Sequence, residues 1–187
     1  MSTTTVPASL AELTGSWTLD TAHSRVGFVA RHAMVTKVRG AFNEFEGSAV
    51  VGDGGIDSAQ IDLTIQVASI DTRNADRDGH LKTGDFLAAE KFPTITFHST
   101  SVKAAGETLE VTGDLTIKDV TKSVTIPFEF DGAALDPFGN VRAGFEGSIA
   151  IQRSDYGITW NAALETGGVL VSDKIVLEFE VSAVKAA

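Results

Sequence analysis

The chain of 187 residues contains no cysteine, which excludes disulfide bridges and thiolate metal sites. Its formal net charge is −10 and it has no run of basic residues, so a nucleic acid is not expected as a partner. No apolar stretch approaches the ~20 residues of a membrane-spanning helix. No basic segment followed by an apolar one opens the sequence, so no signal peptide is recognised and a cytoplasmic location is expected.

The sequence also lacks the common motifs of catalysis and metal binding. Its four histidines are dispersed, and neither an HxH nor an HxxxH spacing is present. There is no Gly-x-Ser-x-Gly elbow, and Gly-rich stretches such as residues 52–55 lack the spacing of a phosphate loop. We therefore predict no catalytic residue, no metal and no cofactor. An enzyme that uses His32 or His80 with neighbouring carboxylates remains a rival hypothesis.

Alternation of apolar and polar residues is the main positive signal. It runs through residues 59–67, 109–118 and 174–181, where every second residue is apolar. A period of two is typical of a strand with one buried and one solvated face. Regular short strands joined by turns favour an all-β sandwich or barrel. The predicted strands are residues 16–20, 25–32, 38–51, 59–70, 94–102, 108–118, 123–130, 141–152 and 174–184.

The alternation stops between residues 71 and 92. Asn74 is expected to cap one short helix, and Asp85 a second one that begins at Phe86. Apolar anchors in this insertion, including Leu81, Phe86 and Leu87, suit a lid over one end of a barrel, although a plug that only closes the core fits them too. Its charged residues are interpreted as a capped, salt-bridged loop rather than as the rim of a headgroup site: Asp71, Arg73, Asp76, Arg77 and Asp78.

A barrel of roughly eight strands can either fill itself with side chains or hold one ligand. Small residues within the strands, such as Ala30, Gly40 and Gly147, leave space and favour a pocket. His32 could bind a headgroup or be purely structural, and Trp160 could fold over the mouth. The predicted ligand contacts are Val26, Phe28, Ala30, His32, Phe42, Ile61, Leu63, Leu81, Phe86, Phe97, Leu115, Phe128, Phe145, Ile149, Trp160 and Leu177.

A series of short motifs carries a family resemblance. They are Trp17-Thr18-Leu19-Asp20-Thr21-Ala22-His23-Ser24, Phe28, Arg31-His32, Lys37-Val38-Arg39-Gly40, Phe42, Asp76-Arg77, Gly79-His80-Leu81, Asp85-Phe86-Leu87, Lys91-Phe92-Pro93-Thr94-Ile95-Thr96-Phe97, the run from Gly113 to Lys122, and Arg153-Ser154-Asp155-Tyr156-Gly157. As an ordered set from about Gly15 onward, they resemble the YceI-like family of bacterial polyisoprenoid-binding proteins. The resemblance implies an extended, lipocalin-like antiparallel barrel that holds an isoprenoid or another long lipid, and a homodimer. Many relatives carry a secretion signal, which is not recognised here, so their periplasmic role is not carried over.

The expected organisation is a flexible segment, residues 1–14, followed by one lipid-binding barrel domain, residues 15–187. The leading hypothesis is a carrier or store for a polyisoprenoid, for example a prenyl quinone. The alternatives are a binder of fatty acid, fatty amide or another lipophilic molecule, an enzyme acting on a lipid, and a structural barrel that holds no ligand.

Overall fold

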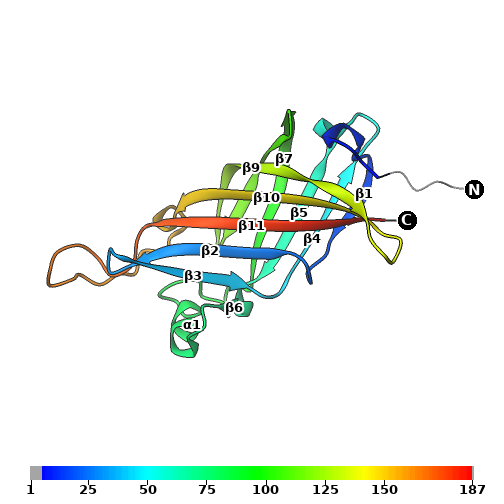
Figure 1. The fold of residues 1–187 in the computed structure, drawn as a ribbon. Helices are drawn as coiled ribbons and strands as arrows, with labels where there is room; N and C mark the ends of the chain where they lie inside the picture. The colour runs from blue at the N-terminus through cyan, green and yellow to red at the C-terminus, as the bar shows by residue number, and fades with distance from the viewer. Residues whose placement is uncertain (1–5, 187) are drawn as a thin grey trace, which may run out of the picture.

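The computed structural model describes residues 6–186 of the chain (Figure 1). Within this range the chain folds into strands and a few short helices. The strands are β1 (Gly15–Leu19), β2 (Arg25–His32), β3 (Thr36–Phe42), β4 (Phe45–Val51), β5 (Gln60–Gln66), β6 (Ile70–Asp71), β7 (Thr94–Ala105), β8 (Thr108–Ile117), β9 (Val120–Leu135), β10 (Val141–Gln152) and β11 (Lys174–Lys185). The helices are α1 (Ala75–Leu81) and the 3-10 turns η1 (Leu10–Glu12), η2 (Ile56–Ser58), η3 (Val67–Ser69) and η4 (Arg153–Tyr156).

Eight of these strands close into an antiparallel barrel in the order β1-β4-β5-β7-β8-β9-β10-β11. Closure comes from β1 and β11, where Trp17 pairs with Lys185 and Leu19 with Ala183. Lower on β11, residues 176–180 pair instead with β2, and β3 and β6 extend the sheet beyond β2. The predicted all-β barrel is therefore confirmed, with a three-stranded extension on one side.

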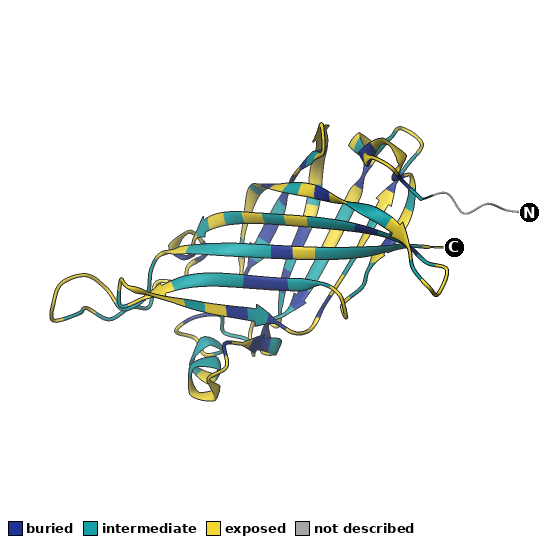
Figure 2. Cartoon of the chain, in the orientation of Figure 1, coloured by how far each residue is buried: buried dark blue, intermediate teal, exposed yellow. Residues whose placement is uncertain are grey.

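The alternation in the sequence sets which side chains face the core. Along β8, Leu109, Val111, Leu115 and Ile117 are each no more than 5% exposed, and Gly113 in the same phase is buried too, while the residues that alternate with them are exposed or half-buried. Buried and exposed residues alternate in the same way along most barrel strands (Figure 2). The polar residues of each strand thus remain in water while its apolar residues are removed from it.

Two predicted strands are each broken into two elements. The expected strand over residues 38–51 is interrupted after Phe42, and the one over residues 59–70 is interrupted by η3. The breaks lie side by side, because the Asn43 amide donates to the Ser69 carbonyl over 3.1 Å and the Gln66 amide to the Glu44 carbonyl over 2.9 Å. Beyond these two breaks, β2, β3 and β6 diverge from the closed barrel.

The insertion holds one of the two predicted helices. Asn74 caps α1 as expected, its side-chain oxygen accepting from the Arg77 amide over 3.0 Å. The predicted helix after Asp85 is wrong: turns replace it, and Ala88 has a φ of +47°, which no right-handed helix allows. The Asp85 carboxylate contacts the His80 ring instead of capping a helix. No helix within residues 6–186 is both long and apolar enough to cross a bilayer.

The N-terminal segment closes one end of the barrel. Residues 1–5 of the predicted flexible segment lie outside the described range, but Leu10 and Leu13 are only 4% and 3% exposed. The Trp17 indole donates to the Leu13 carbonyl over 2.8 Å. The segment from η1 to β1 is therefore part of the packed fold rather than a free leader, because its two leucines cover the barrel end.

Candidate ligand-binding cavity

Three apolar cavities lie inside the barrel. The central cavity, of about 140 Å³, is lined by residues that include Val26, Leu63, Phe97, Leu115 and Phe179. The lid-side cavity, of about 130 Å³, is lined by residues that include Phe28, Ala30, Leu81, Phe86 and Tyr156. The third, the N-terminal-side cavity, is also about 130 Å³ and is lined by residues that include Leu13, Val51, Leu109, Ala143 and Phe145.

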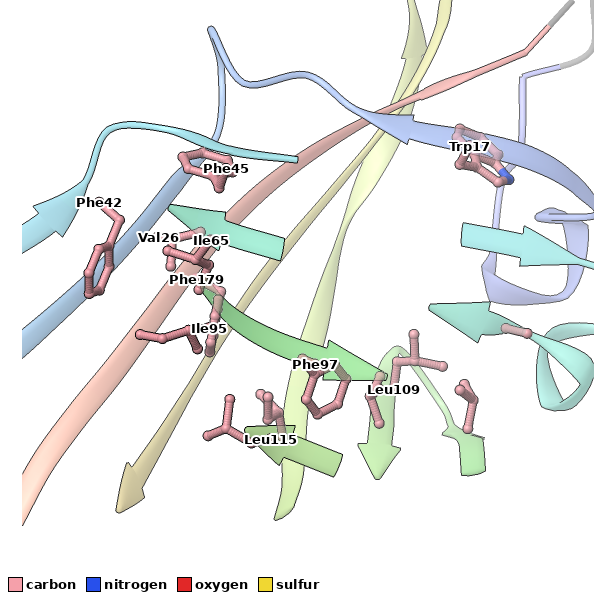
Figure 3. Close-up of a cluster of buried hydrophobic side chains, with 14 of the residues drawn as sticks. Trp17, Val26, Phe42, Phe45, Ile65, Ile95, Phe97, Leu109, Leu115 and Phe179 are labelled. Carbon is pink, nitrogen blue, oxygen red and sulfur yellow. The ribbon is translucent and has the colours of Figure 1, made fainter. Parts of the chain in front are cut away.

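The three cavities form one row along the barrel because neighbouring cavities share wall residues. Phe42 and Leu177 line both the central and the lid-side cavity, and Trp17 and Ala183 line both the central and the N-terminal-side cavity. Figure 3 shows Phe42 and Trp17 toward opposite ends of the cluster of buried hydrophobic side chains. On β11 the lining runs from Ile175 to Ala183, roughly 26 Å of strand at ~3.3 Å per residue. An elongated apolar molecule matches this shape.

Glycines on the inner wall allow phenylalanine rings to lie close to the backbone. Gly40 pairs with Phe28 across β2 and β3, and Gly147 with Phe128 across β9 and β10. A Cβ atom at Gly40 would lie 2.3 Å from Cζ of Phe28, and one at Gly147 would lie 2.6 Å from Cδ1 of Phe128. The Phe28 and Phe128 rings thus occupy the space that a side chain at Gly40 or Gly147 would fill. A wall rich in phenylalanine can therefore line the lumen without filling it.

The insertion covers the lid-side cavity, a position that fits both a lid and a plug. Phe86 is 6% exposed, and it lines this cavity together with Leu81 and Leu87. On its outer side the Phe86 ring packs against His80 and Trp160, with ring centroids 5.0 and 5.3 Å away. His80 and Trp160 contact each other at 4.8 Å. These edge-on and tilted ring contacts join the lid to the loop that follows β10.

The charged residues of the insertion stabilise its own loop. Thr72, 3% exposed, donates from its amide and its hydroxyl to one oxygen of Asp78. Arg77 donates to the Thr72 hydroxyl and carbonyl, both over 2.7 Å. Asp71 accepts from the Arg73 amide, which lowers the pKa of Asp71, with Asn43 as a second donor. The loop interpretation fits, with hydrogen bonds in place of the expected salt bridges.

Arg153 and Tyr156 are the two polar side chains in the lining of the lid-side cavity. Arg153 is 5% exposed and donates to the carbonyls of four loop residues: Ile158, Trp160, Val171 and Ser172. Among the described residues no carboxylate lies within ion-pair distance of it, and burial lowers the pKa of its guanidinium. The Tyr156 hydroxyl is buried without a hydrogen-bond partner in the described structure, and burial raises its pKa. Both residues therefore belong to the cavity wall, but their polar atoms lie behind its apolar surface, and Asp173 is a charged neighbour of Arg153.

The predicted ligand contacts line one of the three cavities, with three exceptions. His32 is exposed, because β2 extends past the barrel end and the face that is inward at Phe28 meets solvent there. Ile149 packs against the core without reaching a cavity, and Trp160 contacts the outer side of Phe86. Contact of the remaining residues with a ligand stays a prediction.

Sequence reasoning missed several cavity residues. Leu13 was not among the predicted contacts, because residues 1–14 were expected to be flexible, and Trp17 was assigned to a strand but not to its inward face. Tyr156 was expected only to pin the loop to the barrel, and Arg153 was noted only as part of a motif. For Arg153 and Tyr156, the available signal was their position between the end of a predicted strand and Gly157. Gly157 has a φ of +75° and ends η4.

The remaining histidines lie apart from the cavities. His23 contacts Asp20 at 2.8 Å and His98 contacts Asp62 at 2.5 Å, both as exposed side chains on the barrel surface. Across residues 6–186 no group of three or more His, Asp or Glu side chains is arranged to hold a metal ion. These pairs lack the inward position that a site for a lipidic substrate would need.

A closed antiparallel barrel with an apolar lumen and a helical lid places the protein in the lipocalin-like class of barrels. The chain belongs to the YceI-like domain family, whose model matches residues 17–183. It is 43% identical to a UPF0312 protein of Pseudomonas aeruginosa over 136 residues, 73% of this chain and 71% of that relative. A UPF0312 protein of Staphylococcus aureus is 41% identical over 170 residues, 90% and 95% of the two chains.

Solved structures share the fold. Burkholderia cenocepacia BcnA superposes with a TM-score of 0.76 at 26% identity, covering 88% of this chain and 98% of that one. The Campylobacter jejuni YceI protein gives 0.70 at 30% identity, covering 84% and 90%. A polyisoprenoid-binding domain from Saccharophagus degradans gives 0.70 over 91% and 98%, and at 13% identity this likeness concerns the fold alone.

Proposed function

We propose that the protein binds a polyisoprenoid or a similar long-chain lipid, for example a prenyl quinone, inside the barrel, and acts as its carrier or store without chemistry of its own. The observation that carries this proposal is the row of three apolar cavities with shared walls. Membership of the YceI-like family supports it, and the fold is shared with a polyisoprenoid-binding domain of Saccharophagus degradans. Each methylene moved from water into the row contributes roughly 0.8 kcal/mol before the entropy losses of binding.

The polar residues of the wall orient this ligand once their polar atoms, which lie behind the apolar cavity surface, turn toward it. Arg153 and Tyr156 both lie at the lid-side end, whereas the N-terminal-side cavity is lined by apolar side chains throughout. A headgroup that accepts hydrogen bonds is therefore favoured at the lid, with the tail directed toward Trp17. A quinone carbonyl meets this requirement.

A second candidate ligand is a fatty acid or fatty amide. The observation that favours it is Arg153, a buried cation that makes hydrogen bonds to carbonyls but has no carboxylate within ion-pair distance in the described structure. A carboxylate headgroup would give Arg153 a direct ion pair, which the nearby Asp173 does not form. The two candidates differ in headgroup and share the same tail site.

Organic extraction of the purified protein, followed by mass spectrometry, separates these possibilities. A co-purified isoprenoid supports the first candidate, and a co-purified fatty acid or amide the second. Delipidated protein should then bind added ubiquinone or oleate, measured by quenching of Trp17 and Trp160, the two tryptophans of the chain. Failure to bind either probe, with nothing extracted, refutes the proposal in favour of a barrel that holds no ligand. Turnover of an added lipid supports an enzyme instead.

The proposal also includes the cytoplasmic location and the homodimer that were expected at the outset. Cell fractionation and light scattering of the purified protein test these two points independently of ligand binding.

A further inference from the structure

Two loops at the lid-side end of the molecule meet in an exposed apolar tip. We define the apolar tip as Met34, Val35 and Val169, which are 59%, 75% and 38% exposed. Met34 and Val35 form the turn between β2 and β3, and Val169 belongs to the loop between η4 and β11. The two loops are joined, because the Ala33 amide donates to the Leu170 carbonyl over 2.8 Å. Both project from the same end of the barrel (Figure 1).

Basic side chains stand behind the apolar tip. Arg31, Lys37, Arg39 and Lys174 line one shallow surface groove beside it, together with a single acidic residue, Glu178. All four basic residues are exposed. This concentration contrasts with the whole chain, in which 25 acidic residues outnumber 15 Lys and Arg. We call this set the basic groove.

The apolar tip adjoins the lid-side cavity. Ala30 and Val171, which line that cavity, lie within a few residues of Met34 and Val169 along their segments. Only two residues of β2 follow Ala30 before the turn that carries Met34, a strand rise of about 7 Å. A surface that contacts this tip therefore faces the lid-side end of the row of cavities.

We propose that this end of the molecule docks on an anionic lipid bilayer. The apolar tip enters the headgroup region, and the basic groove contacts anionic headgroups, a pairing of apolar and cationic residues that binds membrane surfaces. Three exposed apolar side chains are too few for the area of a stable protein interface, which argues against a protein partner. Docking deepens the proposed function, because it brings the ligand cavity to the membrane where long-chain lipids reside.

The opposite end of the barrel supplies a matched control. Phe138, in the turn between β9 and β10, is 87% exposed and therefore more accessible than any residue of the apolar tip. Its turn holds Asp136 rather than a basic groove, and the turn is on the side of the C-terminus in Figure 1. Apolar exposure alone would predict membrane contact at both ends, whereas docking as proposed requires contact at the lid-side end only.

Vesicle flotation tests the proposal. Wild-type protein should float with vesicles of equimolar phosphatidylcholine and phosphatidylglycerol, and should stay in solution with pure phosphatidylcholine or at high salt. The double variant Met34→Ser/Val35→Ser should lose flotation, and Lys37→Gln/Arg39→Gln should lower the partition coefficient by about 30-fold. Phe138→Ser should float like the wild type. Circular dichroism confirms that each variant is folded.

Several outcomes would overturn docking. These are no flotation of the wild type with anionic vesicles, flotation that Phe138→Ser reduces as much as the tip variant does, or a tip variant that alters only the self-association seen by light scattering. Mass spectrometry of extracted lipid is run on the same samples. Anionic-vesicle binding by a protein that holds no ligand would remove the proposed function and leave docking, whereas ligand binding without flotation would remove docking alone.

Discussion

Replacing Tyr156 by Phe should stabilise the delipidated protein. The hydroxyl is buried and makes no hydrogen bond within the described structure, and the ring itself is 2% exposed. A buried polar group without a partner costs about 1–3 kcal/mol of desolvation, which Phe does not carry, while the ring keeps its packing. Thermal unfolding should therefore shift upward by about 2–4 °C for each kcal/mol gained.

The pH dependence gives a second readout of the same group. Burial raises the pKa of Tyr156, with the neighbouring Asp155 charge as a smaller cause. Above pH ~10 the unfolded chain loses this proton while the folded chain keeps it, so wild-type stability falls as the pH rises there. Tyr156→Phe should lack this component of the alkaline loss. Tyr156 is the sole tyrosine, so its ionisation can be followed directly by ultraviolet absorbance.

Tyr156→Phe should also weaken binding of a lipid whose headgroup accepts a hydrogen bond, while leaving binding of a plain hydrocarbon unchanged. A variant that is less stable than the wild type by 1 kcal/mol or more, together with ordinary ionisation of Tyr156 near pH 10, would show that the hydroxyl is hydrogen-bonded or solvated, and the reasoning would fail.

Three further changes test the cavity and the barrel. Ala30→Trp should abolish lipid binding with little change in melting temperature, because the indole enters cavity space. The control is Ala150→Trp, because Ala150 faces outward. If Ala30→Trp lowers the free energy of unfolding by ~1–3 kcal/mol and no ligand is ever detected, the core is packed and holds no ligand cavity. Gly40→Ala should reduce the affinity for long lipid tails, because the new Cβ displaces the Phe28 ring that covers Gly40. Tryptophan quenching measures this affinity, and an unchanged value would contradict the prediction. Arg142 lowers the pKa of Asp20 to about 2, so wild-type stability falls as the pH drops from ~4 to 2. Arg142→Gln should be less stable at pH 7 and approach the wild type at pH 2 in urea unfolding, and an equal difference at both pH values would refute the link.

The alternation in the sequence predicts most of the barrel wall because its cause is local. Successive side chains of a strand point to opposite faces, so Phe97 and Leu115 could be assigned to the lumen without knowledge of their neighbours. The cap at Asn74 could be assigned for the same reason, since a cap depends on residues only a few positions away.

The features that sequence reasoning missed depend on distant partners. The strand break at Asn43 comes with a pairing to Ser69, and the burial of Leu13 comes with a contact to the barrel end. Arg153 is held by carbonyls as far away as Ser172, so its role in the cavity wall cannot be derived from its neighbours in the chain. His32 shows the converse case. The alternation correctly places it on the same face of β2 as Phe28, but β2 extends beyond the barrel, so this face is exposed to solvent at His32.

The strand that closes the barrel has a consequence for biosynthesis. Closure pairs β1 with β11, the first and last strands in chain order, and β11 also holds β10 and β2. On the ribosome, the growing sheet therefore keeps open edges at β1 and β10 until β11 has left the exit tunnel. Such long-range closure folds slowly and leaves apolar strand edges exposed to aggregation. The lumen can thus form only after translation of nearly the whole fold.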